Sequence, residues 1–259
     1  MDFEHIRLEL SPAAVATVTL DRPDSLNALN AAMLDELRAA VESLPASGAR
    51  CLLLAGEGRG FSSGADLASG GGLPEDVGAA LEAHYNPLIE ALFALPLPVV
   101  AAVNGPCAGA GCSLALAADI VVAGRSAYFL QAFVNIGLIP DAGATWLLPR
   151  LAGRARAMEM MMLGERIPTE QAAAWGLVNR VVDDEDLASE AVALATRLAQ
   201  GPTVALGLLR GLARHAEQHS LTEALAAERI AQRDAGRTED FRSAVLAFLQ
   251  KRQPTFDGR

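Results

Sequence analysis

The sequence has 259 residues, enough for one large α/β domain or two small ones. Its hydrophobic content of 51% supports a sizeable core, and the aromatic content of 5% means that Ala, Leu and Val must fill it. The formal net charge of −10 argues against a surface that binds nucleic acid or an anionic membrane. An anionic ligand therefore needs a local basic group, and Lys251 is the single lysine.

Strand-like and helix-like segments alternate over the first half of the chain. Short apolar runs predict buried strands at 15–20, 51–55, 99–103 and 120–123. Asn30 can cap a helix with apolar residues at spacings of three and four. That apolar stripe comprises Leu34, Leu37, Val41 and Leu44. A loop is predicted at 69–74 and a helix at 75–95. The alternation predicts parallel strands joined by crossover helices.

From about residue 142 the pattern becomes almost wholly helical. The predicted helices are 154–163, 169–175, 187–200, 203–215, 221–235 and 240–250, with one strand at 178–182. We therefore divide the chain into a core at 1–200, which carries the ligand site, and a helical region at 201–259. A helical region that is apolar on several faces suits an oligomer interface.

Cysteines, charges and helix breakers indicate a cytoplasmic protein without a membrane span. Cys51, Cys107 and Cys112 are odd in number and lie in apolar settings, which favours buried reduced thiols over a metal site or a disulfide. The first ten residues carry four charges, unlike a signal peptide. The uncharged segment 91–118 could span a bilayer by length, but its prolines and glycines break it. We interpret it as buried core.

Two glycine-rich turns about forty residues apart are the most informative feature. The first is GFSSGAD at 60–66, and the second is NGPCAGAG at 104–111, which leads into an apolar helix predicted at 112–118. Small residues leave backbone N–H groups accessible, and a helix N-terminus directs them outward with the positive end of its dipole. Two such turns facing each other could hold an oxyanion between two donors. The alternative is that both are only tight strand-to-helix turns.

Other polar residues near these motifs are interpreted as structural. Asp66 is expected to order its loop by side-chain-to-backbone bonds, and Asp119 to anchor a helix–strand junction. His215 and His219 are four residues apart, a spacing that can bind metal. They lack the glutamate that zinc proteases place after the first histidine. We therefore expect a solvated helix face and no metal site.

These motifs resemble the crotonase superfamily, the enoyl-CoA hydratase/isomerase fold. The resemblance covers nearly the whole chain, at 21–23, 26–30, 60–66, 102–105, 109–111, 119–120, 137–143, 172–178 and 248–252. It implies an α/β fold, a spiral of ββα units with a C-terminal helical trimerisation region, assembled as a homotrimer or a dimer of trimers. It also implies an acyl-CoA thioester as substrate and no resident cofactor.

The resemblance also assigns site residues. The backbone N–H groups of Ser63 and Ala110 would bind the thioester oxygen. The other contacts to CoA and the acyl group would come from Arg22, Ser25, Leu26, Ser62, Gly64, Ala65, Asp66, Gly109, Phe248 and Lys251. Lys251 would meet the CoA adenine and phosphates, often across a subunit boundary, or would simply be exposed to solvent. His84 and Tyr85 could line the acyl pocket or only pack.

Hydratases of this family use two glutamates, and the flanking motifs align Ser113 and Phe133 with them. Neither is a carboxylate, so classical hydration is disfavoured. Asp141 remains, with apolar neighbours that would raise its pKa toward a value useful for proton transfer. A single carboxylate can carry a proton from the α to the γ carbon, an isomerisation for which we expect no role of the Ser113 hydroxyl. The alternative is that Asp141 only caps the following helix.

The stretch 139–157 is most similar to bacterial ring-1,2-epoxyphenylacetyl-CoA isomerases. The predicted function is an acyl-CoA isomerase that moves a double bond or opens a ring epoxide. Its substrate would be 2-(1,2-epoxy-1,2-dihydrophenyl)acetyl-CoA or a Δ3-enoyl-CoA. One alternative is an enoyl-CoA hydratase in fatty-acid or aromatic-acid degradation. Another is a non-catalytic acyl-CoA-binding protein.

Overall fold

The computed structural model describes residues 3–68 and 76–259, and the strands of this part form two sheets. The larger sheet has the order β1 (Ile6–Leu10), β2 (Val15–Leu20), β3 (Cys51–Gly56), β4 (Val99–Val103), β6 (Ile120–Gly124), β9 (Arg180–Val182). The smaller has the order β5 (Pro106–Ala108), β7 (Tyr128–Leu130), β8 (Ile167–Pro168). β1 pairs antiparallel with β2, and the rest of the larger sheet is parallel. The α/β fold class and the parallel pairing are confirmed.

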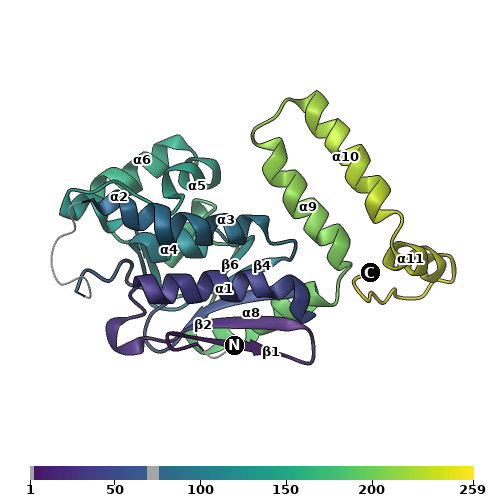
Figure 1. Cartoon of the computed structure of the whole chain (residues 1–259), viewed down its shortest axis with the longest axis horizontal. Helices are drawn as coiled ribbons and strands as arrows, with labels where there is room; N and C mark the ends of the chain where they lie inside the picture. The colour runs from purple at the N-terminus through teal and green to yellow at the C-terminus, as the bar shows by residue number, and fades with distance from the viewer. Residues whose placement is uncertain (1–2, 69–75) are drawn as a thin grey trace.

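Helices cover both faces of the larger sheet and continue into a C-terminal arm (Figure 1). The first are α1 (Ala31–Ser47), α2 (Val77–Ala80), a π-helical turn (Leu81–Tyr85), α3 (Asn86–Ala94) and α4 (Gly109–Leu116). They are followed by α5 (Ala144–Leu151), α6 (Arg154–Leu163), α7 (Thr169–Ala174) and α8 (Leu187–Ala199). The arm consists of α9 (Thr203–Ala216), α10 (Leu221–Ala235) and α11 (Glu239–Leu249). Short 3-10 turns lie at Pro23–Ser25, Ala132–Ile136 and Asp184–Asp186.

The middle of the larger sheet is buried on both faces, because β3, β4 and β6 contain only apolar residues and glycine. In β3, Leu52 and Leu54 join the core cluster that contains α1, α3 and α4, whereas Cys51 and Leu53 join the cluster that contains α8. This two-residue alternation is strand geometry. The predicted cap of α1 is confirmed, since the Asn30 side chain accepts the Met33 N–H at 2.8 Å. The apolar stripe of α1 is buried as expected.

Besides the smaller sheet, which was not predicted, three parts of the fold differ from the sequence-based expectation. β1 was not predicted, because Arg7 and Glu9 interrupt its apolar residues, as an edge strand tolerates. The helix expected at 75–95 consists, where described, of α2, the π-helical turn and α3. The helix expected at 112–118 is α4, which begins three residues earlier, at Gly109. The loop expected at 69–74 lies outside the described residues.

The segment 91–118 is buried core, as predicted, and contributes the end of α3, then β4, β5 and α4. Cys51, Cys107 and Cys112 are buried free thiols, also as predicted. Within residues 3–68 and 76–259, no single helix is long and apolar enough to cross a membrane. The helical segments 184–199 and 203–216, which meet at a sharp bend, are together long and apolar enough by length and composition alone.

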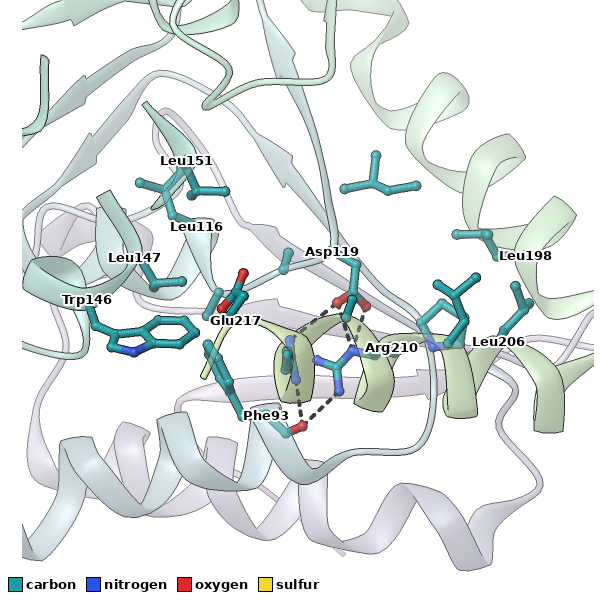
Figure 2. Close-up of a pocket in the computed structure, with 17 residues that line it drawn as sticks. Phe93, Leu116, Asp119, Trp146, Leu147, Leu151, Leu198, Leu206, Arg210 and Glu217 are labelled. Atoms are coloured by element: carbon teal, nitrogen blue, oxygen red, sulfur yellow. Dashed lines mark hydrogen bonds and ion pairs between the residues drawn. The ribbon is translucent and has the colours of Figure 1, made fainter. Parts of the chain in front are cut away.

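A buried arginine fastens the C-terminal arm to the core. Arg210 of α9 is 5% exposed and donates to the Asp119 carboxylate at 2.7 Å (Figure 2). It also donates to the Leu92 carbonyl oxygen at 2.6 Å. Asp119 also accepts the Val99 N–H at 2.8 Å, which confirms its predicted anchoring role. Arg214 adds a second ion pair to Asp119 at 3.3 Å. We call this group the arm clamp.

A cavity of about 400 Å³ lies beside the arm clamp, between α9 and the ends of α3, α4 and α5. Its walls are mainly apolar, with Leu116, Trp146 and Leu206 among the side chains that Figure 2 shows. The described residues that line it include none of the predicted site residues. The candidate active site is therefore built elsewhere, around the two glycine turns.

Candidate active site

The two glycine turns lie against each other. Gly64 and Gly109 have φ angles of +94° and +52°, a backbone conformation that favours glycine. A Cβ on Gly64 would lie 2.9 Å from the Ala108 carbonyl oxygen, so a side chain there would push the turns apart. The turns are also joined by backbone hydrogen bonds, from Ala108 N–H to the Ser62 oxygen at 2.9 Å and from Ser62 N–H to the Pro106 oxygen at 3.1 Å.

The first turn is anchored to the segment 22–28 by a buried amide. Asn27 is 0% exposed, and its side chain accepts the Arg22 N–H at 2.9 Å and donates to the Gly60 carbonyl oxygen at 2.8 Å. The Ser62 hydroxyl donates to the Asn27 carbonyl oxygen at 2.8 Å. Arg22 pairs with Asp66 at 2.8 Å. These bonds gather the predicted residues of both segments at one place.

The structure corrects the assignment of the first oxyanion donor. The Ser63 N–H donates to the Leu26 carbonyl oxygen at 2.9 Å, and the Ser63 hydroxyl to the Ser25 oxygen at 3.1 Å. That N–H is therefore occupied within the fold. The Ala65 N–H has no hydrogen-bond partner among the described residues, and Ala65 is exposed. We therefore take the Ala65 N–H, which follows the left-handed turn at Gly64, as the candidate first donor in place of the Ser63 N–H.

The second donor comes from the N-terminus of α4. Because α4 begins at Gly109, Ala110 lies in its first turn, where N–H groups have no acceptor within the helix. The positive end of the helix dipole favours negative charge there. Gly111 permits close contact with the first turn, since a Cβ on it would lie 2.4 Å from the Ser62 Cβ. Ala65 and Ala110 thus offer backbone N–H groups on two turns in contact.

Asp141 is a partly buried carboxylate for which the described residues provide no hydrogen-bond partner. Its Oδ1 is buried and accepts no hydrogen bond in the part of the chain that the structure describes. Burial raises the pKa of Asp141 to about 6. The N-cap of α5 is Gly143, with no side-chain cap bond, so Asp141 does not cap that helix. Its carboxylate is therefore available for proton transfer.

Ser113 and Phe133, the residues in place of the hydratase glutamates, lie beside the second turn. The Ser113 hydroxyl donates to the Asp141 carbonyl oxygen at 3.0 Å and approaches the Gly109 carbonyl oxygen at 3.4 Å. The Phe133 ring is buried and would lie 3.8 Å from a Cβ on Gly109. The Ser113 hydroxyl therefore has a contact to the Asp141 segment, which the sequence did not predict.

His84 and Tyr85, which could have lined the acyl pocket, have different neighbours. His84 pairs with Asp35 of α1 at 2.9 Å. Tyr85 is buried at the end of the π-helical turn, and its pKa is raised to about 12, first by burial and then by the nearby charges of Asp141 and Asp66. Tyr85 is thus the one of the two that lies near Asp141.

Phe248 belongs to α11 and Lys251 follows it, and Figure 1 shows α11 apart from α4. Phe248 is 80% exposed, and Lys251 is exposed. Within one chain they are not brought to the site. His215 and His219 stack with ring centroids 3.6 Å apart, and His219 is exposed. Among the described residues, no three His, Cys, Asp or Glu side chains gather as a metal site requires.

Two backbone N–H groups on turns in contact and one desolvated carboxylate, on a two-sheet α/β fold with a helical arm, are the elements that an oxyanion-hole enzyme of the crotonase type requires. The model of the enoyl-CoA hydratase/isomerase family matches residues 11–259. The chain therefore belongs to the enoyl-CoA hydratase/isomerase family.

Named relatives cover almost the full chain. The 1,2-epoxyphenylacetyl-CoA isomerase of Escherichia coli K12 is 49% identical over 250 residues, 95% of each chain. A Rhodobacter capsulatus protein named "probable enoyl-CoA hydratase" is 46% identical over 259 residues, 100% of each. The solved enoyl-CoA hydratase of Bacillus anthracis has a TM-score of 0.94 and 32% identity, covering 99% of this chain and 100% of that one. Because the names include both reactions, the choice between them depends on the site residues.

Proposed function

We propose that the enzyme is an acyl-CoA isomerase in which Asp141 carries a proton and the N–H groups of Ala65 and Ala110 hold the thioester oxygen. The observation that carries the proposal is the partly buried Asp141 carboxylate, whose Oδ1 accepts no hydrogen bond from the described residues and whose backbone carbonyl oxygen is bound to Ser113 of α4. A pKa of about 6 suits a group that must both take up and release a proton near neutral pH. Ser113 and Phe133 supply no second carboxylate to activate water.

The proposed reaction balances with one base. Asp141 takes a proton from the α carbon of a Δ3-enoyl-CoA, and the electron pair spreads into a dienolate whose negative oxygen lies between the two N–H donors. The double bond moves to the α–β position when Asp141 returns the proton to the γ carbon. Water, an oxidant or a reductant is not consumed.

The proposed substrates share the need for a stabilised thioester enolate. They are 2-(1,2-epoxy-1,2-dihydrophenyl)acetyl-CoA, whose epoxide ring would open, and Δ3-enoyl-CoA. The likeness to the Escherichia coli 1,2-epoxyphenylacetyl-CoA isomerase supports the aromatic substrate. The coenzyme A thioester is the substrate itself, so no resident cofactor is proposed.

We further propose that the region 201–259 assembles the chain into a homotrimer or a dimer of trimers. Its helices expose large apolar side chains, which include Leu221, Leu225, Phe241, Leu246, Phe248 and Leu249. Such a surface is expected to be buried against another copy. Phe248 and Lys251 would then reach the CoA bound by a neighbouring copy. Light scattering should give a trimer or hexamer mass, and a stable monomer at micromolar concentration would contradict the assembly.

Isotope labelling tests the reaction class. The enzyme is incubated with a Δ3-enoyl-CoA in H₂¹⁸O and, separately, in D₂O, and the products are examined by mass spectrometry. An isomerase should give the Δ2-enoyl-CoA without ¹⁸O, with deuterium entering from D₂O. Formation of an ¹⁸O-labelled 3-hydroxyacyl-CoA as the main product would instead make the enzyme a hydratase.

A further inference from the structure

Among the described residues, the hydrogen bonds that hold Asp141 go to its backbone and not to its carboxylate. Its carbonyl oxygen accepts two hydrogen bonds, from the Ala144 N–H at 3.0 Å and from the Ser113 hydroxyl at 3.0 Å. Its Oδ1 accepts none from the residues described. A charged partner would also fix the side chain, but it would favour the ionised form and weaken the carboxylate as a base. Hydrogen bonds to the backbone alone position Asp141 without lowering the basicity of its carboxylate.

The segment that follows Asp141 needs such fixing. Ala142 has a φ of +49°, a left-handed conformation that is costly for a residue with a Cβ, and Gly143 follows with +83°. Strained backbone of this kind persists only when its surroundings hold it. Ser113 is 0% exposed and 28 residues distant in sequence, so its hydroxyl is a tertiary contact of this segment.

We propose that Ser113 is a positioning residue, whose hydroxyl ties the backbone of Asp141 to the helix that carries the Ala110 N–H. The inference rests on the proposed function, because it assigns Ser113 a part only in that proton transfer. Ser113 and Ala110 are one turn apart on α4, so one rigid element sets both the oxyanion donor and the base. The carboxylate is thereby kept at a fixed distance from the carbon that it deprotonates.

The test compares kcat, KM and melting temperature for Ser113→Ala, Ser113→Thr and a matched control. Ser113→Ala removes the tie, and kcat should fall roughly 10- to 100-fold, because displacements near 1 Å in a reacting pair have effects of this size. KM should stay within about twofold, since the oxyanion donors are unchanged. Ser113→Thr keeps the hydroxyl and should restore most of kcat. The control is Ser43→Ala, which removes a hydroxyl that donates only to the Ala40 carbonyl oxygen of its own helix.

Asp141→Asn, measured in parallel, separates this inference from the proposed function. Loss of turnover in Asp141→Asn with wild-type kcat in Ser113→Ala overturns the positioning role and leaves the proposed function intact. Equal losses in Ser113→Ala and Ser113→Thr, at unchanged melting temperature, also overturn it. If Asp141→Asn retains full turnover, the proposed function and this inference fail together.

Discussion

Replacing Asp141 with asparagine should stabilise the protein while it removes activity. The carboxylate is partly buried, its Oδ1 accepts no bond from the described residues, and burial raises its pKa from 3.8 to about 6. Burial of the charged form therefore opposes folding. Asparagine has nearly the same shape and no charge, so the substitution relieves this cost.

The sign and size of the stability gain in Asp141→Asn follow from proton linkage. For a carboxyl group whose pKa is higher in the folded state, the cost is absent below pH 3.8 and fully present above about pH 6. A rise to about 6 corresponds to at most about 3 kcal/mol at pH 7.5, and to roughly half that at pH 5. Partial exposure of Asp141 lowers both values. The advantage of Asp141→Asn should therefore shrink as the pH falls.

Urea unfolding of wild type and Asp141→Asn at pH 7.5 and pH 5 measures this difference. Asp24→Asn, which removes an exposed carboxylate, is the control and should change stability little at either pH. A gain for Asp141→Asn at pH 7.5 that shrinks at pH 5 agrees with the reasoning. A variant that is less stable than wild type at pH 7.5, or a gain independent of pH, would refute the desolvated carboxylate.

Three further substitutions test other parts of the structure. Gly64→Ala should lower kcat/KM by about 10²-fold, because its Cβ would lie 2.9 Å from the Ala108 oxygen. Gly48→Ala is the control, since Gly48 has a similar φ but open space around it, and this variant should keep activity. Arg210→Ala should lower the free energy of unfolding by about 3 kcal/mol, the lower end for breaking a buried ion pair, because Asp119 is 27% exposed and keeps Arg214 as a partner; a loss below 1 kcal/mol contradicts this. Lys251→Ala should weaken CoA binding about tenfold by calorimetry without changing kcat, and unchanged affinity would remove its proposed role.

Local sequence signals were sufficient to predict most of the helices. The predicted bounds 154–163 and 221–235 agree with α6 and α10, because Gly153 and Gly164 flank the first and Ser220 with Glu223 forms a capping box on the second. The smaller sheet was missed because β5, β7 and β8 have two or three residues each, too few for a periodic pattern. The edge strand β1 was missed because its formation depends on antiparallel pairing with β2, which its own residues do not indicate.

In the site, sequence located the turns but not the hydrogen bonds within them. Which N–H of the first turn is available depends on the Leu26 carbonyl oxygen, which binds Ser63 and leaves Ala65 without a described partner. Spacing along the chain carries no information on that choice. The contact of Ser113 with Asp141 joins residues 28 positions apart and was likewise invisible. The apolar surroundings of Asp141 were readable, and the predicted rise of its pKa is confirmed.

The most direct test of the account is solvent deuterium exchange at the α carbon of bound acyl-CoA in Asp141→Asn. If Asp141 carries the proton, the variant should still bind acyl-CoA. Both its turnover and its exchange rate should fall by roughly 10²–10⁴, the usual effect of losing a general base. Near-wild-type exchange in Asp141→Asn would contradict the account, since another group would then remove the α proton.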